Sequence, residues 1–323
     1  MTRKQTLVNL LFKMVNKTKG EILRVLRASG GYVSGEVLSK GLGVSRVSIW
    51  KHLRGLMRQG YAIEPSPRGY RLISSPDSLL PYELSGWEQR IHHFREVGST
   101  MEVAKELVKK GAEEGTIVVT ECQARGRGRL SKQWFSPRGG IYFTLSLKPR
   151  ISPAYAPRIN LMASVAVAKA IRELFGLAAE LKWPNDVLIG GKKVCGILAE
   201  MEAEMDSINF VNLGIGINAN FPVSRYEEGA TSLKEELGKE IVRTELLSSV
   251  LKEIGEQQAL LTKADLLEEW KAFSATLNRD VRVVGVGEEV TGKAIDVDSN
   301  GALVVKCLDD SIRSIIAGDC FHL

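Results

Sequence analysis

The chain has 323 residues, of which 44% are hydrophobic and 25% are charged. These proportions are ordinary for a folded protein of two or three domains, so they exclude a globally disordered chain and a fibrous repeat. No apolar run is long enough to cross a bilayer, and we find no secretory signal. The four cysteines lie far apart without a CxxC pair. This argues against a disulfide framework or a zinc knuckle, and predicts a cytoplasmic protein without a membrane partner.

The net charge of +6 is unevenly distributed along the chain. Residues 1–72 hold 14 Lys and Arg against three acidic residues, a net charge of +11, so the remainder carries −5. Concentrated positive charge attracts phosphate backbones, because binding releases condensed counterions. On charge alone, nucleic-acid binding and a merely solvated basic tail are equally good interpretations of this segment.

The basic segment itself divides into an arm and a module. Residues 1–19 are predicted to be a basic arm, either an amphipathic helix or a loose extension. From Gly20, three short helices are expected, the second with an N-cap at Ser34 and an end near Lys40, the third at residues 46–58 with an N-cap at Ser45. Residues 61–63 and 69–72 alternate around a Pro-Ser-Pro turn and predict a β-hairpin. The residues expected to point inward are Ile22, Leu23, Leu26, Val37, Leu38, Ile49, Leu53, Leu56 and Met57.

Helices, a basic third helix and a hairpin together predict a winged helix-turn-helix whose third helix enters the major groove of DNA. A small helical cap that docks a protein partner is the alternative. Because His52 is isolated, we expect it to contact phosphate or pack against the module and not to bind a metal. The serine and proline content of residues 74–77 predicts a linker into the next domain. The candidate DNA-binding residues are Gly35, Ser45, Arg46, Ser48, Lys51, His52 and Arg54.

The central part of the chain is predicted to be α+β with a mixed sheet. Strands outnumber helices, and hairpin-sized turns such as Gly190-Gly191 connect several of them, which disfavours a doubly wound parallel sheet. The expected helices are residues 100–110 and 156–174. The expected strands are residues 95–97, 117–120, 141–147, 187–189, 193–200 and 208–217.

Three motifs in this part could carry chemistry. Residues 125–129, Arg-Gly-Arg-Gly-Arg, combine backbone that can approach an anion with charge-assisted donors, although such runs are also typical of flexible RNA-binding segments. Residues 182–186, Lys-Trp-Pro-Asn-Asp, could hold hydrated Mg²⁺ near phosphates or could simply begin a strand. Residues 192–200 predict a strand with two lysines and Gly196, where a ligand could approach the backbone closely. The alternative is a hairpin strand whose lysines are only solvated. No histidine lies near a serine or cysteine elbow, so a nucleophilic triad is not indicated.

Together these residues resemble the biotin protein ligases, specifically the bifunctional type that doubles as biotin operon repressor. The resemblance extends from about Gly20 to the C-terminus. Its motifs are Gly98-Ser99-Thr100, Gln123 with Gly126-Arg127-Gly128-Arg129 and Trp134, Lys182-Trp183-Pro184-Asn185-Asp186, residues 193–200, and Gly214-Ile215-Gly216-Ile217-Asn218. The sequence departs from the family pattern at residues 130–133, where a glycine and an arginine often follow, and in its tail, which lacks an arginine.

The resemblance implies a mixed sheet flanked by helices and followed by a small SH3-like β-barrel. The implied domains are a basic arm at 1–19, the DNA-binding domain at 20–75, the ligase domain at 76–272 and the barrel at 273–323. Short strands at 281–284, 290–297 and 302–307, with a hairpin turn at Asn300-Gly301, are predicted independently from the pattern.

The implied activity is ATP-dependent formation of biotinyl-5′-AMP, followed by transfer of biotin to a lysine of the acceptor domain of a biotin-dependent carboxylase. ATP and Mg²⁺ are the implied co-substrate and activator, without a tightly bound prosthetic group. The implied catalytic residues are Lys193, Arg127 and Arg129. The implied biotin site is Ser99, Thr100, Met101, Gln123, Gly126, Arg127, Gly128, Arg129, Lys193 and Gly196. The implied nucleotide site is Arg129, Trp134, Lys182, Asn185, Asp186, Lys193 and Asn218, with Asp186 near Mg²⁺.

The other implied partners are operator DNA and a second copy of the chain, in a homodimer promoted by biotinyl-5′-AMP. Two alternatives are a lipoate-type ligase and a transcription factor whose ligase body is only a sensor. The DNA-binding module and the Gly-Arg-Gly-Arg loop count against the first, and Arg127, Arg129 and Lys193 count against the second.

Overall fold

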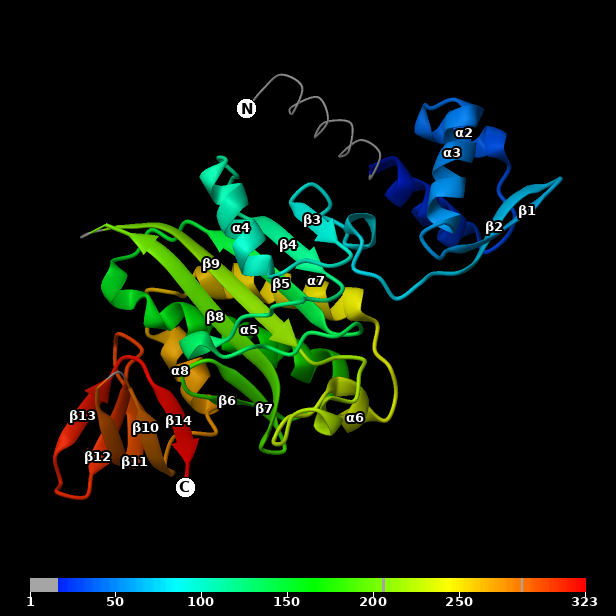
Figure 1. Ribbon diagram of the computed structural model, residues 1–323. Coiled ribbons are helices and arrows are strands. Elements are labelled where there is room, and N and C mark those ends of the chain that lie inside the picture. The colour runs from blue at the N-terminus through cyan, green and yellow to red at the C-terminus, as the bar shows by residue number, and fades with distance from the viewer. Residues whose placement is uncertain (1–16, 205–206, 286) are drawn as a thin grey trace. The chain divides into compact units, whose positions relative to one another are not determined.

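The computed structural model describes residues 17–204, 207–285 and 287–323 (Figure 1). Most of the predicted basic arm therefore lies outside the described residues. The chain divides into two compact units, residues 1–91 and 92–323. None of the described helices is long and apolar enough to span a bilayer.

The first unit is the predicted winged helix-turn-helix. A helix at residues 17–29 is followed by α2 (Gly35–Leu42), α3 (Arg46–Met57) and an antiparallel hairpin of β1 (Ala62–Ser66) and β2 (Gly69–Ser74). Ser34 and Ser45 are the N-caps, as predicted, because their side chains accept hydrogen bonds from the backbone N–H groups of Val37 and Ser48. The core holds the predicted Ile22, Leu23, Leu26, Leu38, Ile49, Leu53 and Leu56.

Backbone contact fixes how the hairpin meets the helices. Val33 forms an antiparallel bridge with Tyr70, and their backbone N–H and C=O groups exchange two hydrogen bonds of 2.9 Å. Gly69 has a φ of +130°, and a Cβ there would lie 2.1 Å from the Val33 carbonyl oxygen. Only glycine fits at this approach. Leu80, which precedes a 3₁₀ turn at Pro81–Glu83, and Tyr82 within that turn join the same core, so the unit extends beyond the predicted linker.

Two predictions are wrong in detail. Val37 is 58% exposed instead of inward, because the buried stripe of α2 runs through Leu38 and the partly buried Leu42, four residues apart. The strand predicted at 95–97 lies earlier, as β3 (Ile91–Phe94), with Ile91 as its buried residue. Val97 makes only a single parallel bridge with Gln123, because the chain turns at Gly98 into the next helix.

The second unit contains the predicted mixed sheet. Its strand order is β3-β4-β5-β9-β8-β7-β6. Neighbouring strands are antiparallel in the pairs β4–β5, β5–β9, β9–β8, β8–β7 and β7–β6. A parallel bridge joins Val97 and Gln123, which follow β3 and β4 along the chain. Glycines 190 and 191, both with positive φ, make the predicted hairpin turn between β7 and β8. The strands are β4 (Thr116–Thr120), β5 (Ile141–Leu147), β6 (Ala179–Lys182), β7 (Asp186–Ile189), β8 (Lys192–Ala203) and β9 (Ile208–Ile217).

Helices cover this sheet. The predicted helices are α4 (Thr100–Lys109), which packs on β4, β5 and β9, and α5 (Pro157–Phe175), which packs on β6, β7 and β8. The side of α5 that faces the protein is rich in Ala and Val, whose small volumes allow close approach to the sheet and to α7. The elements of this unit without a specific prediction are β6, α6 (Leu233–Leu237), α7 (Arg243–Gln258), α8 (Asp265–Ala272), the last two strands of the chain (Ile312–Ile315 and Asp319–His322) and 3₁₀ turns at Arg129–Ser131, Pro153–Tyr155 and Val223–Arg225.

A small antiparallel β domain ends the chain, as predicted (Figure 1). Its strand order is β13-β12-β11-β10-β14. Trp183 connects the large sheet to this domain, because its indole N–H donates to the Gly301 carbonyl (3.2 Å) and its backbone N–H donates to Thr276 Oγ1 (3.0 Å). The strands are β10 (Asp280–Val284), β11 (Glu289–Val297), β12 (Leu303–Cys307), β13 (Ile312–Ile315) and β14 (Asp319–His322).

A buried ion pair joins α7 to the sheet. Arg243, 2% exposed, donates to Glu121 Oε2 (2.8 Å) and to the Gly140 carbonyl (2.7 Å), and His93 Nε2 lies 3.1 Å from Glu121 Oε1. Removing one partner leaves a buried charge uncompensated. We expect Arg243→Met to lower the free energy of unfolding by about 2 kcal/mol, less than for an isolated buried pair because His93 still contacts the carboxylate.

Urea denaturation measures this effect. The matched control is Lys252→Met on the same helix, whose exposed pair with Glu256 contributes little. Equal stability of the Arg243 variant and the control would contradict the assignment.

His322 makes stability depend on pH. Burial, with the charges of Lys182 and Arg279, lowers the pKa of His322 from 6.5 to about 4, so its neutral Nε2 can accept from the Thr276 hydroxyl (3.1 Å). Below pH 6.5 the unfolded chain takes up a proton that the folded chain refuses, so stability falls between pH 6.5 and 4. We expect His322→Gln to remove about 1 kcal/mol of the loss between pH 7.5 and 4.5, since partial exposure screens the effect. Parallel pH slopes for both proteins in urea denaturation would contradict this.

Candidate active site and nucleic-acid interface

Three glycines form the floor of a cavity in the second unit. Gly196 of β8 lies opposite Gly216 of β9, and Gly214 lies two residues before Gly216, on the same face. A Cβ on Gly216 would lie 2.2 Å from Trp134 Nε1, and one on Gly214 would lie 2.6 Å from Met101 Sδ. The glycines therefore let the indole and the thioether lie directly on the sheet.

One end of the cavity is polar and uncharged. Gln123 Oε1 accepts from the Thr100 backbone N–H (2.9 Å), Gln123 Nε2 donates to Ser136 Oγ (2.9 Å), and the Thr144 hydroxyl donates to Thr100 Oγ1 (2.9 Å). Ser99, only 1% exposed, has no hydrogen-bond partner for its hydroxyl within the described chain. A buried polar group without a partner costs free energy, so Ser99 is ready to bind a polar ligand.

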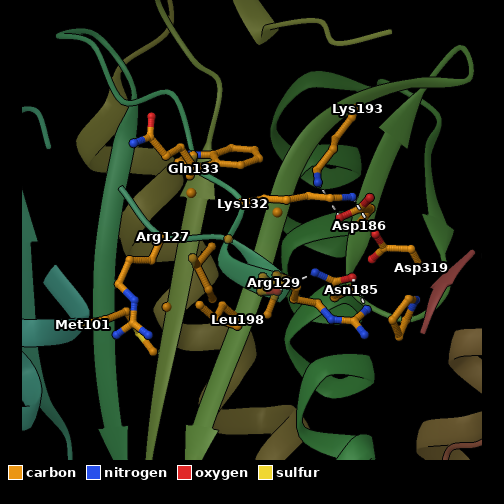
Figure 2. Close-up of a pocket in the computed structure, with 18 of the residues that line it drawn as sticks. Met101, Arg127, Arg129, Lys132, Gln133, Asn185, Asp186, Lys193, Leu198 and Asp319 are labelled. Carbon is orange, nitrogen blue, oxygen red and sulfur yellow. Dashed lines mark hydrogen bonds and ion pairs between the residues drawn. The ribbon is translucent and has the colours of Figure 1, made fainter. Parts of the chain in front are cut away.

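The basic loop, residues 125–133, lines the cavity, and three of its side chains pair with residues elsewhere in the second unit; Figure 2 labels Arg127, Arg129 and Lys132. The Arg127 Nη2 atom lies 2.6 Å from Glu200 Oε1, Arg129 Nη1 donates to Asn185 Oδ1 (3.1 Å), and Lys132 Nζ lies 2.5 Å from Asp319 Oδ2. Burial lowers the pKa of Arg129, against the opposing attraction of Asp319 and Asp186. A half-buried guanidinium interacts strongly with an anion that enters the cavity.

Lys193 is the central cation of the site. Its Nζ lies 2.7 Å from Asp186 Oδ1 and 5.1 Å from the centroid of the Trp134 ring. Figure 2 shows Lys193 and Lys132 converging on Asp186 and Asp319. The ammonium group is therefore held at the cavity by a carboxylate that a substrate anion could replace.

Most predicted site residues meet at this cavity. The members that line it are Ser99, Thr100, Met101, Gln123, Arg127, Gly128, Arg129, Trp134, Lys182, Asn185, Asp186, Lys193 and Gly196.

Gly126 and Asn218 do not line the cavity. A Cβ on Gly126 would lie 2.3 Å from the Trp134 carbonyl oxygen, so this glycine shapes the loop. The Asn218 side chain donates to the Thr231 carbonyl (3.0 Å) and the Lys193 carbonyl (3.4 Å). Asn218 therefore positions the backbone of Lys193 from behind the site.

Sequence reasoning missed the contribution of the C-terminal domain. Asp319, Cys320 and Phe321 of β14 line the cavity, as do Lys132, Gln133 and Glu227. The Lys132–Asp319 pair joins residues 187 positions apart, and no local sequence pattern predicts such a contact. Within the described ranges, no group of three or more His, Cys, Asp or Glu could hold a metal ion.

The first unit presents the predicted DNA-binding residues unequally. Arg46, Lys51 and Arg54 are exposed on α3, whereas Ser48 is half-buried and the Ser45 hydroxyl serves as the N-cap. His52 is half-buried on the side of α3 towards the core, and burial together with Lys19 lowers its pKa. Gly35 lines a hollow with Arg46 and Tyr70.

Comparisons with known proteins agree with both units. Three family models match the chain: HTH domain at residues 19–71, Biotin/lipoate A/B protein ligase family at 94–218, and Biotin protein ligase C terminal domain at 276–323. The bifunctional ligase/repressor BirA of Bacillus subtilis is 36% identical over 313 residues, covering 91% of this chain and 94% of that protein. BirA of Escherichia coli is 28% identical over 308 residues, covering 92% and 95%.

A solved structure matches most of this chain. The biotin protein ligase of Aquifex aeolicus in complex with biotin and ATP aligns with a TM-score of 0.63 and 30% identity, covering 72% of this chain and 98% of that chain. Fold and site thus define a carboxylate-activating protein ligase joined to a helix-turn-helix domain. The chain belongs to the biotin protein ligase family, and its relatives place it with the bifunctional ligase/repressors, which confirms the resemblance.

Proposed function

We propose that this chain activates biotin with ATP, transfers it to a lysine of a carboxylase acceptor domain, and represses biotin genes with biotinyl-5′-AMP as corepressor. The observation that carries the enzymatic part is the polarity of the cavity. A buried, unpartnered hydroxyl at Ser99 lies among uncharged polar groups, and the cations Arg127, Arg129 and Lys193 line the same cavity. This suits a neutral polar head and an anionic tail, which biotin combines in one molecule.

In the first step, Ser99, Thr100 and Gln123 hold the ureido ring, and Met101 with Trp134 flank the aliphatic chain. The biotin carboxylate oxygen attacks the α-phosphorus of ATP, the bond to the β-phosphate oxygen breaks, and pyrophosphate leaves with the electron pair. Carboxylate and phosphate repel one another. Lys193 and Arg129 offset this repulsion and stabilise the charge that develops on the phosphoryl oxygens.

In the second step, the uncharged amine of the acceptor lysine attacks the acyl carbon of biotinyl-5′-AMP. The amide bond forms, the mixed anhydride breaks and AMP leaves. The nucleophile comes from the acceptor, which accounts for a site built from cations and hydrogen-bond donors. Arg127 and Gly128 keep the loop over the intermediate and shield it from water.

The nucleotide end of the cavity fits a divalent cation bound mainly through phosphates. Asp186 supplies a carboxylate beside Asn185, and Lys182 lines the same wall. With no larger acidic cluster in the described chain, phosphate oxygens and water would complete the ligand set. Bound Mg²⁺ supplies charge neutralisation on the phosphates. We propose Asp186 as its protein ligand.

Biotin-dependent exchange of labelled pyrophosphate into ATP tests the enzyme. We expect exchange with biotin and far less with lipoate at the same concentration. Preference for lipoate would instead support the related lipoate-type ligase. A mass increase on an acceptor domain tests the transfer step.

Repression rests on the first unit and its relatives. We propose that biotinyl-5′-AMP promotes a homodimer that matches a two-fold symmetric operator. A gel shift with promoter DNA of biotin genes should show much tighter binding with biotin plus ATP than without. Equal binding in both conditions would remove the corepressor role.

The domain boundaries and the compartment complete the proposal. We propose functional domains at residues 20–75, 76–272 and 273–323, in a cytoplasmic protein. All four cysteines, which lie in the described ranges, are free, and this supports a reducing compartment.

A further inference from the structure

The recognition helix carries an unusual exposed face. Ile49, Leu53 and Leu56 of α3 are buried, and the opposite face presents residues at i, i+3, i+4 and i+7. These are Val47, Trp50, Lys51 and Arg54. Two of the four are apolar, with Val47 62% exposed and Trp50 46% exposed.

A single exposed apolar side chain needs no explanation. Here the two side chains lie one turn apart on the face that the winged helix-turn-helix presents to a groove. Both also line a hollow of the first unit, together with Arg46 and with Ser66 and Pro67 at the hairpin turn. The pair therefore belongs to a shaped surface.

The charge around this surface favours DNA over a protein partner. Arg46, Lys51 and Arg54 are exposed on the same helix, Arg68 is exposed at the hairpin turn, and Glu36 is the acidic residue that lines the hollow. The guanidinium of Arg54 lies 4.8 Å from the centroid of the Trp50 ring. Such stacking holds the indole and the arginine in one orientation before DNA is bound.

Base edges in the major groove offer hydrogen-bonding atoms and one prominent apolar group, the 5-methyl of thymine. Contacts to phosphate position a helix but carry no sequence information. Resting on the proposed operator binding, we propose that Val47 and Trp50 contact thymine methyl groups and thereby determine which sequence α3 recognises. The flanking cations of α3 supply the contacts that position it.

Replacing thymine by uracil tests the proposal, because it removes the methyl and keeps every hydrogen-bonding atom. The full chain, with biotin and ATP, first selects its site from a random double-stranded library. Each thymine of that site is then replaced singly and the dissociation constant is measured. Wild type should lose about four-fold in affinity at each contacted thymine, as expected for one buried methyl. Val47→Ala and Trp50→Ala should each be insensitive at one of these positions.

The matched control is Ile73→Ala, which truncates an apolar residue of β2 that is 55% exposed and outside the hollow. It should keep the full uracil sensitivity. Ligase activity should be unchanged in all three variants, since none lies in the second unit.

Equal affinity of wild type for thymine and uracil sites overturns the inference while leaving operator binding intact. Uracil sensitivity that persists in both α3 variants also overturns it. If no DNA is selected under any condition, the proposed operator binding itself fails.

Discussion

Lys193→Ala should reduce biotin-dependent pyrophosphate exchange by about a thousand-fold, because it removes the cation placed between two mutually repelling substrates. Loss of one preorganised donor to a developing anion costs roughly 10²–10³ in rate, and a full charge lies at the upper end of this range. The Lys193 ammonium lies 2.7 Å from Asp186 and over the Trp134 ring, whereas the nearby Lys132 is paired with Asp319.

The adjacent lysine provides the control. Lys192 precedes Lys193 on β8, and successive strand residues point to opposite faces, so Lys192→Ala should keep near-normal exchange. Ligand-free DNA affinity of Lys193→Ala should equal that of wild type, because Lys193 belongs to the second unit. Undiminished exchange in Lys193→Ala would show that the role assigned to this residue is wrong.

Gly216→Ala should reduce the same exchange by about a hundred-fold through shape alone. The new Cβ would lie 2.2 Å from Trp134 Nε1, so the indole must leave its place on the cavity floor. A displacement of about 1 Å in a positioning group can cost about 10²-fold in rate. The chain should still fold, because Trp134 lies on a loop outside the strands of the sheet.

Gly255→Ala is the matched control, since a Cβ there meets nothing within 4 Å on α7 and alanine favours a helix. Adding Trp134→Phe to Gly216→Ala removes the colliding edge of the ring and should recover part of the exchange. A full-activity Gly216→Ala variant, or no recovery in the double variant, would contradict the account of the floor.

Local sequence was sufficient for much of the fold. Ser34 and Ser45 cap helices because the donors they satisfy lie three residues away. Alternation and turn residues located β5, the β7–β8 hairpin and β10 to β12, because a strand is defined by side-chain period and by where its turns can form. The predicted inward position of Val37 was wrong, because in a short helix one residue separates the buried stripe from the exposed face.

The departure from the family pattern at residues 130–133 shows where local reasoning ends. In this loop the chain has Lys132 but no arginine between Arg129 and Trp134. The tail of the chain also lacks the arginine that the family pattern led us to expect. The structure pairs this lysine with Asp319 of β14, so the loop and the C-terminal domain meet across the cavity. Neither segment contains a signal for the other.

From local sequence alone came many of the helices and strands, the helix caps, the basic first unit and the motifs that the family shares, because these depend on neighbours along the chain. The packed structure was needed to show that Asn218 lies behind Lys193, that β14 completes the cavity, and that Val47 and Trp50 face outward. These facts depend on which distant segments pack together. That choice is made by burial and close packing over the whole chain.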